Sequence, residues 1–125
     1  MLKLVFNIRR RPEIEPEEFY RYWNDEHGPL VRPFAEVLGI RRYVQSHTID
    51  TPINDALQAS RNTEPRYDGV AELWWDSVED FVGRLADPAA HAASATLLED
   101  EGKFIDLPAT SIFLTEEHEI IPLPV

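Results

Sequence analysis

The chain has 125 residues, 43% of them hydrophobic, which fits a single domain over residues 1–125 with a modest core. Its 23 acidic and 12 basic residues give a formal charge of −11, which disfavours binding to nucleic acid or to an anionic membrane surface. The chain has no cysteine, which excludes disulfides and thiolate catalysis. It has no apolar run of membrane-spanning length and no secretory signal pattern, so we expect a cytoplasmic protein.

A strand and a long helix are predicted first. Residues 2–9 alternate between apolar and polar side chains, which predicts a strand with one apolar face. Pro16, preceded and followed by glutamates, is typical of a helix start. The apolar spacing then predicts a helix to about Leu38, which Gly39 ends.

His27 lies in this predicted helix where the apolar positions Phe19, Trp23 and Phe34 would place another apolar side chain. Pro29 cannot donate to the carbonyl four positions earlier, so the helix is expected to loosen beside the imidazole. Because imidazole exchanges protons near neutral pH, the combination indicates a proton carrier in the wall of a cavity. The alternative is a core histidine bonded to a backbone carbonyl freed at Pro29.

Residues 40–48 alternate again and predict a second strand, with Tyr43, Gln45 and His47 on one face. The polar stretch 49–66 predicts a long loop, either a lid or a solvated excursion, with a short helix through residues 56–60. Residues 68–76 predict a third strand with bulky side chains on both faces, so we expect both faces to be covered.

Two helical segments follow, one capped by Ser77 and ending near Asp87, the other running from Ala89 to Gly102. Residues 110–115 predict the last strand, and residues 116–125 a tail. The order predicts an α+β, ferredoxin-like βαββαβ fold, with a four-stranded antiparallel sheet and helices on one face. A second copy packed sheet to sheet is the simplest cover for the other face, so we expect a homodimer.

Four groups of residues, in this order and spacing, resemble the EthD family. They are Phe19 and Trp23 with His27, Gly28 and Pro29; Tyr43, Val44 and Gln45 with His47; the stretch from Asp68 to Trp74; and Asp100 and Glu101 with Phe104. The resemblance runs from the first strand to Glu116. It implies a dimeric α+β barrel with a ligand cavity between each sheet and its own helices. Its members include lactone isomerases, fungal polyketide dehydratases and proteins of ether-degradation operons, so it indicates the fold more securely than the reaction. Some related isomerases carry a cysteine at the position of Leu73, so a thiol mechanism is excluded here.

The candidate catalytic residues are His27, Tyr43, His47 and Asn7. A positioned histidine can move a proton at a carbon next to a carbonyl, while Tyr43, His47 or Asn7 would hold the carbonyl oxygen. Side chains expected to line a site for a small hydrophobic or aromatic substrate are Phe6, Phe34, Leu73, Trp75 and Phe104. We therefore predict a cofactor-free isomerase, dehydratase or cyclase-type lyase acting on a cyclic or polyketide-like carbonyl compound.

Other interpretations remain open. A cofactor-independent monooxygenase of an electron-rich aromatic would use Trp75, Asn7 and His27, and a non-catalytic protein would bind a hydrophobic metabolite for a partner oxidase. The four histidines lack the paired spacing of a metal site, so no metal is expected, and the predicted proton-transfer chemistry needs no cofactor. Strand alternation does not tell whether Tyr43 and His47 face the helices or a dimer partner.

Overall fold

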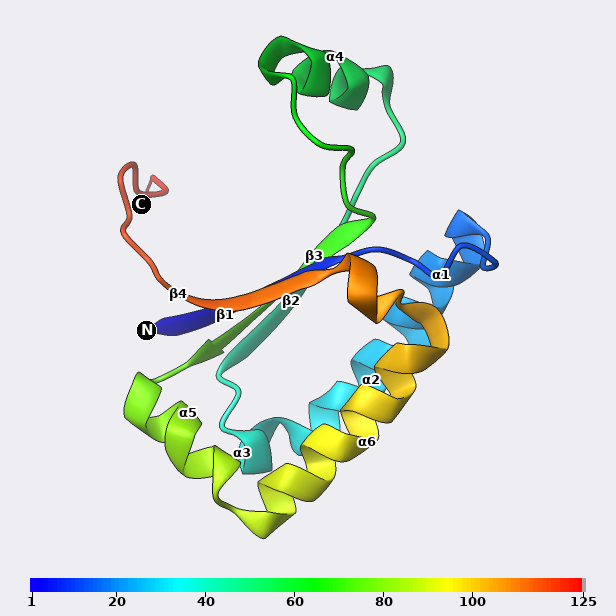
Figure 1. Cartoon of the computed structure of the whole chain (residues 1–125). Helices are drawn as coiled ribbons and strands as arrows, with labels where there is room; N and C mark the ends of the chain where they lie inside the picture. Colours follow the sequence, from blue (N-terminus) through cyan, green and yellow to red (C-terminus); the bar gives the residue numbers. More distant parts are fainter. Residues whose placement is uncertain (125) are drawn as a thin grey trace.

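The computed structural model describes residues 1–124 and contains a four-stranded sheet with helices packed on one of its faces (Figure 1). The strands are β1 (Leu2–Ile8), β2 (Arg42–His47), β3 (Gly69–Trp75) and β4 (Ser111–Glu116). They lie in the order β2-β3-β1-β4, and each neighbouring pair is antiparallel. The predicted α+β, ferredoxin-like fold is confirmed.

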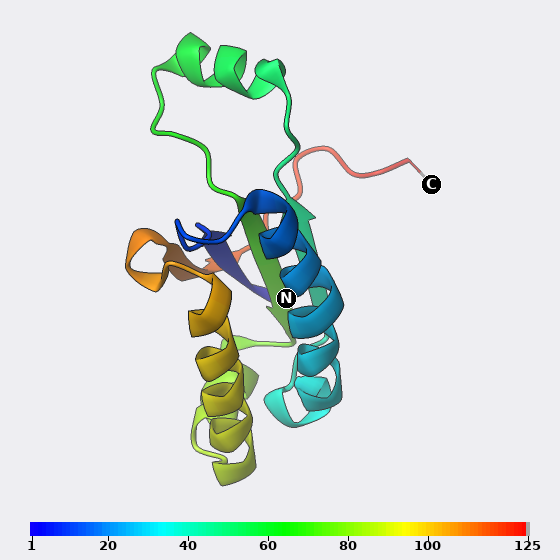
Figure 2. The same cartoon turned by 90° about the vertical axis from the view of Figure 1, so that its right-hand side faces the viewer.

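The helix layer is built from two long segments of chain that run side by side (Figure 2). The first contains α1 (Pro16–Tyr22), α2 (Gly28–Val31) and α3 (Ala35–Leu38), and the second contains α5 (Val78–Leu85) and α6 (Pro88–Phe104). The predicted helix over residues 16–38 is therefore present, but it is interrupted twice. A π-helical turn spans Trp23–His27 and a 3₁₀ turn spans Arg32–Phe34. Another 3₁₀ turn, Leu107–Ala109, leads into β4.

The strand register assigns side chains to the two faces of the sheet. Phe6 pairs with Ala71, and Leu4 and Tyr43 both pair with Leu73. Because side chains at paired positions point to the same face, Tyr43 shares the helix-covered face with the apolar residues of β1. Gln45 and His47 follow Tyr43 at two-residue steps, so they face the helices as well.

The core has two parts between the sheet and the helices. Phe19, Trp23 and Phe104 are fully buried in one part, together with residues of β1 and β3. Val31 and Leu97 belong to the other part, nearer α3 and the start of α6. These two parts position the helices over the sheet and leave room between them.

Residue 69 can only be glycine in this packing. A Cβ atom built on Gly69 would lie 2.5 Å from Cζ3 of Trp23 and 2.7 Å from the carbonyl oxygen of Ser46. The indole ring of Trp23 therefore lies directly on the backbone of β3, which fixes the distance between the first helical segment and the sheet.

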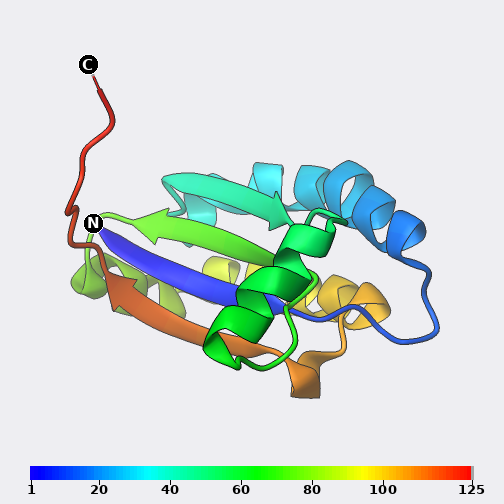
Figure 3. The same cartoon turned by 90° about the horizontal axis from the view of Figure 1, so that it is seen from above.

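The stretch over residues 49–66 is more ordered than predicted. It contains the ten-residue helix α4 (Pro52–Arg61), capped at its start by the Thr51 side chain and ended by Asn62 with φ 52°. The helix stands off the sheet on the side opposite the other helices (Figures 1 and 3). None of its residues is buried, and Ile53 and Leu57 are exposed. The prediction of a loop with a short helix at 56–60 underestimated it because proline at the first turn and a threonine cap favour an earlier start.

No helix within residues 1–124 is both long enough and apolar enough to cross a membrane.

Candidate active site

The space between the sheet and the second helical segment contains two adjoining chambers. The larger has a volume of about 280 Å³ and is walled mainly by apolar side chains of β1, β3, α5 and α6. The smaller has a volume of about 60 Å³ and reaches His27 and Trp23. Four residues line both chambers: Phe6, Leu73, Leu97 and Glu101. The chambers therefore form one branched cavity with His27 at its narrow end.

His27 is held by a buried carboxylate. Its side chain lies inside the protein, with the residue 5% exposed, and its Nδ1 is 2.7 Å from Oδ2 of Asp100, which is 7% exposed. The hydroxyl of Tyr22 donates to the other oxygen of Asp100, and Nζ of Lys103 is 3.5 Å from it. Burial alone would raise the pKa of Asp100, but hydrogen bonds from Tyr22 and His27 outweigh this and hold its pKa below the usual value.

This carboxylate fixes the tautomer of the imidazole. An ionised Asp100 only accepts hydrogen bonds, so Nδ1 of His27 carries the proton and donates. Nε2 then presents its lone pair. Among residues 1–124, no hydrogen-bond partner of Nε2 is found. In the same residues, every fully buried side-chain nitrogen or oxygen has a hydrogen-bond partner, so Nε2 is not fully buried. Nε2 is therefore accessible, and the small chamber is the space that His27 lines. The alternative of a histidine bonded to a freed backbone carbonyl does not describe this contact.

The π-helical turn gives His27 its position. Pro29 has no N–H, so the carbonyl of Asp25 lacks its α-helical donor, and the turn widens as predicted. At the start of this turn, the carbonyl of Trp23 accepts from the N–H of Gly28, five residues on, and also from Nε2 of Gln45 at 2.8 Å. The helix is thereby tied to β2 immediately beside the histidine.

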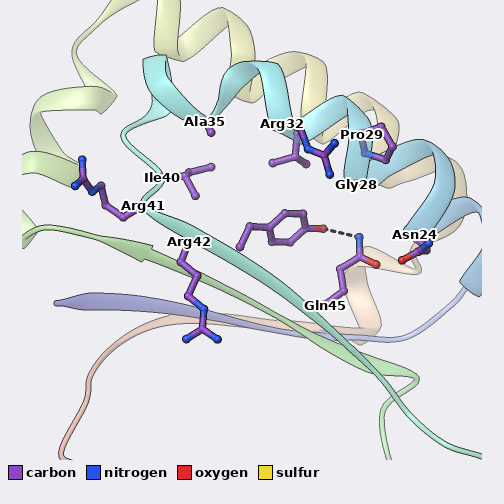
Figure 4. A pocket seen from close by; sticks show the side chains of 11 residues that line it. Asn24, Gly28, Pro29, Arg32, Ala35, Ile40, Arg41, Arg42 and Gln45 are labelled. Atoms are coloured by element: carbon purple, nitrogen blue, oxygen red, sulfur yellow. Dashed lines mark hydrogen bonds between the residues drawn. The ribbon is translucent and has the colours of Figure 1, made fainter.

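Tyr43 separates the small chamber from an open groove on the outside of the protein. This groove, of about 510 Å³, runs between the first helical segment and β2, with Arg32 and Gln45 pointing into it from opposite walls (Figure 4). The Tyr43 hydroxyl accepts from Nε2 of Gln45 at 2.9 Å, which leaves its own proton available to a ligand. Burial raises the pKa of Tyr43, so it stays a donor.

Glu101 lies at the junction of the chambers and was not among the predicted site residues. Burial, with a smaller contribution from the charge of Asp100, raises its pKa from 4.5 to about 7. The sequence offered one signal, because Glu101 belongs to a quoted family motif and follows Leu97 by one helical turn. Periodicity alone did not distinguish it from the exposed Glu99, two residues earlier on α6.

The structure brings some of the predicted residues to the cavity. Phe6 and Leu73 line both chambers, Trp75 lines the larger one, and His27 and Tyr43 line the smaller one. Trp75 is also fixed in place, because its Nε1 donates to the carbonyl of Leu38 at 2.7 Å.

Asn7 and His47 lie elsewhere. Asn7 belongs to the opposite face of β1, where its Nδ2 donates to Oγ of Ser111 at 3.1 Å. It cannot reach a substrate beside His27, so its assignment is corrected. His47 faces the helices but stacks on the rings of Trp23 and Tyr20, with centroids 4.6 and 5.1 Å away. Its Nε2 is 2.8 Å from Oε1 of Gln45, and burial lowers its pKa. It supports Gln45 and does not line either chamber.

Two predicted wall residues are core residues instead. Phe104 is 1% exposed and packs beneath the imidazole of His27, with ring centroids 5.1 Å apart. Phe34 packs against the core part that contains Val31 and Leu97. Neither lines a chamber, and Phe34 is only partly buried.

Within residues 1–124, no group of three or more histidine, aspartate or glutamate side chains is placed to hold a metal ion. The candidate site is thus a histidine–carboxylate pair, a tyrosine hydroxyl and a half-buried glutamate around an apolar cavity.

Comparison with known proteins shows which family this chain matches. Residues 11–108 match the family model described as the EthD domain. The dehydratase ustZ of Ustilaginoidea virens is 28% identical over 100 residues, which cover 78% of this chain and 69% of that protein.

Solved structures share the fold at lower identity. An ethyl tert-butyl ether degradation (EthD) family protein from Bacillus halodurans aligns with TM-score 0.61 and 19% identity, over 94% of this chain and 99% of the other. A dimeric protein of unknown function with a ferredoxin-like fold, from Bacteroides fragilis, aligns with a TM-score of 0.57 and 12% identity, over 93% of this chain and 95% of the other. SnoaB, a cofactor-independent oxygenase from Streptomyces nogalater, aligns with a TM-score of 0.56 and 16% identity, over 98% of this chain and 97% of the other. At these identities the likeness shows the fold alone.

Proposed function

The chain belongs to the EthD family, and from this premise we propose that it is a cofactor-free enzyme that moves a proton at a carbon next to a carbonyl group. The observation that carries the proposal is the buried His27–Asp100 pair, which leaves one ring nitrogen without a partner among residues 1–124 on a histidine that lines the small chamber. A histidine held by a carboxylate in one tautomer is a base with a fixed direction of attack.

Each polar group of the cavity has a role in this reaction. Nε2 of His27 takes the proton from the carbon, and Asp100 stabilises the imidazolium that forms. The Tyr43 hydroxyl, whose proton is not used by Gln45, donates to the carbonyl oxygen as it gains negative charge. Such a base contributes about a hundred- to ten-thousand-fold in rate.

The cavity indicates a compact apolar substrate. Ligand pockets usually measure about 300–1,000 Å³, and the larger chamber, at about 280 Å³, lies just below this range. Its walls include Leu73, Trp75 and Phe81, which suit a cyclic or aromatic ring system. The carbonyl group would then lie in the narrow end beside His27.

Proton exchange at carbon tests this proposal without knowledge of the natural substrate. The bicyclic ketone 1-tetralone is incubated with the protein in D₂O, and loss of its C2 protons is followed by NMR. We expect exchange above the buffer rate, and its loss in the variant His27→Gln. His118→Gln, which changes an exposed histidine of the tail, is the matched control and keeps the wild-type rate. Exchange that survives His27→Gln contradicts the proposal.

The two other predicted functions are less well supported. An oxygenase built on Trp75, Asn7 and His27 needs these side chains around one substrate, whereas Asn7 lies on the far face of the sheet. A non-catalytic metabolite-binding protein has no use for a buried carboxylate that fixes the tautomer of a cavity histidine. A ligand that binds without any exchange or turnover would favour the binding protein.

We also propose that the protein is a homodimer that packs sheet to sheet. The face opposite the helices carries the apolar side chains of Val5, Val44, Val70, Trp74 and Phe113. Helix α4 and the C-terminal segment project from this same side, with exposed Ile53, Leu57, Ile120 and Ile121. The aligned Bacteroides fragilis protein is dimeric. The same face carries Lys3, Glu72 and Arg42, and Trp74 is already buried, so a second copy would cover the apolar side chains that remain accessible between these groups.

A further inference from the structure

We propose that Glu101 is the general acid of this cavity and that the substrate class is a β-hydroxy carbonyl compound, from which the enzyme removes water. This inference rests on the proposed function, because it takes His27 as the base. It adds the second proton transfer and, with it, the identity of the leaving group.

The placement of Glu101 on α6 separates its task from that of Asp100. Consecutive helical residues point about 100° apart. Asp100 is directed at Nδ1 of His27, and Glu101 is directed at the cavity. The other residues that line both chambers, Phe6, Leu73 and Leu97, are apolar, so Glu101 is the one ionisable side chain at the junction among the described residues. A substrate that extends from the narrow end into the larger chamber must pass it.

The surroundings of Glu101 favour its protonated form near neutral pH. Burial and the neighbouring charge of Asp100 both disfavour the carboxylate. The other titratable or charged groups that line the chambers are His27 and Tyr43 in the smaller one, and Arg84 of α5 and His91 of α6 itself in the larger one. The guanidinium of Arg84 is already bonded to the carbonyls of Glu36 and Val37 and to Asp80, so it is not free to pair with Glu101.

The elimination balances with these groups alone. Nε2 of His27 takes the proton from the carbon next to the carbonyl, and the C–H electron pair becomes the carbon–carbon double bond. The C–O bond at the next carbon breaks, its electron pair leaves with oxygen, and the proton of Glu101 converts the departing hydroxyl to water. The imidazolium then loses its proton, and the Glu101 carboxylate regains one, by exchange with solvent. No oxidant, metal or co-reactant is required.

A second acid distinguishes elimination from isomerisation. An isomerase can return the abstracted proton from the same histidine, and it has no leaving group to protonate. Hydroxide is a poor leaving group, so an acid at the junction is of most use when a C–O bond breaks there. The 28% identical protein from Ustilaginoidea virens is a dehydratase, which supports this choice.

Two related probes separate the base from the acid. 1-Tetralone has no leaving group and reports only proton removal by His27. 3-Hydroxy-1-tetralone carries a hydroxyl at the β carbon, and loss of water converts it, after tautomerisation, to fluorescent 1-naphthol. Both rates are measured for wild type, for Glu101→Gln and for the control Glu99→Gln, which changes an exposed acid on the same helix.

We expect Glu101→Gln to lower the ratio of the naphthol rate to the exchange rate at least about tenfold, because glutamine keeps the shape but donates no proton in catalysis. Glu99→Gln leaves the ratio at the wild-type value. The ratio should also fall in the wild type as the pH rises through about 7, where Glu101 loses its proton, and this trend should be absent in Glu101→Gln. An unchanged ratio in Glu101→Gln overturns the role of Glu101, whereas a wild type that exchanges no protons overturns the proposed function itself.

Discussion

Replacing Glu101 by glutamine should make the protein more stable at alkaline pH, by an amount that the pKa of Glu101 sets. In the folded protein its pKa is raised from 4.5 to about 7. The folded state therefore keeps a proton that the unfolded chain releases, and stability falls as the pH rises from 4.5 to about 7 and is level above. One pKa unit corresponds to about 1.4 kcal/mol. Between pH 5.5 and pH 8.5 the raised pKa of Glu101 therefore lowers the free energy of unfolding of the wild type by about 2 kcal/mol, and this loss is absent in Glu101→Gln.

Urea unfolding of wild type, Glu101→Gln and Glu99→Gln at one protein concentration, at pH 5.5 and 8.5, measures this difference. The difference in the free energy of unfolding between Glu101→Gln and wild type should be about 2 kcal/mol more favourable to the variant at pH 8.5 than at pH 5.5. Glu99→Gln, at an exposed position, should keep the same offset from wild type at both pH values. A gain for Glu101→Gln that is equal at the two pH values would refute the argument, since the carboxylate would then be as stable in the cavity as in water.

Three further predictions test the His27–Asp100 pair, the packing of Trp23 on Gly69 and the proposed dimer. Asp100→Asn should reduce 1-tetralone exchange by about a hundred- to ten-thousand-fold, because the amide no longer fixes the Nδ1–H tautomer of His27; an exchange rate near wild type would contradict the dyad. Gly69→Ala should lower the free energy of unfolding by about 2 kcal/mol or more through its clash with Trp23, whereas Gly83→Ala, with no atom within 4 Å of the added methyl, should not destabilise. Val5→Glu places an unpaired charge beside Glu72 among the apolar side chains of the outer sheet face and should convert dimer to monomer in sedimentation velocity, with an unchanged far-UV circular dichroism spectrum as the sign that the fold is kept.

The fold was readable from the sequence because its elements are strongly periodic. The alternation in β1, the proline and glycine at the two ends of the first helical segment, and the capped start of α5 each indicated an element that the structure contains. The inward position of His27 followed from the same periodicity, and the missing N–H of Pro29 foretold the loosened turn. These are local features, so the sequence alone carries them.

The rest of the site depends on contacts between distant segments. Glu101 differs from the exposed Glu99 of the same helix by the sector of α6 that it occupies, and which sector meets the cavity depends on how α6 crosses the sheet. The carboxylate of Asp100, 73 residues away in the chain, was identified as the partner of His27 only by the fold. Asn7 is a different case. It adjoins Phe6 in a strand, where neighbouring side chains point to opposite faces, so the two could never have shared one wall.

The π-helical turn also keeps the first helical segment in phase with the cavity. Phe19, Trp23, His27 and Val31 recur at intervals of four residues, and all four are buried. In an uninterrupted α-helix every fourth residue advances by about 40°, so four such positions would wind away from the sheet. A single wider turn cancels part of this drift and holds the imidazole in line with its buried neighbours. The turn therefore keeps both the imidazole and the Val31 side chain on the buried side of a segment that a regular α-helix of the same sequence would turn toward solvent.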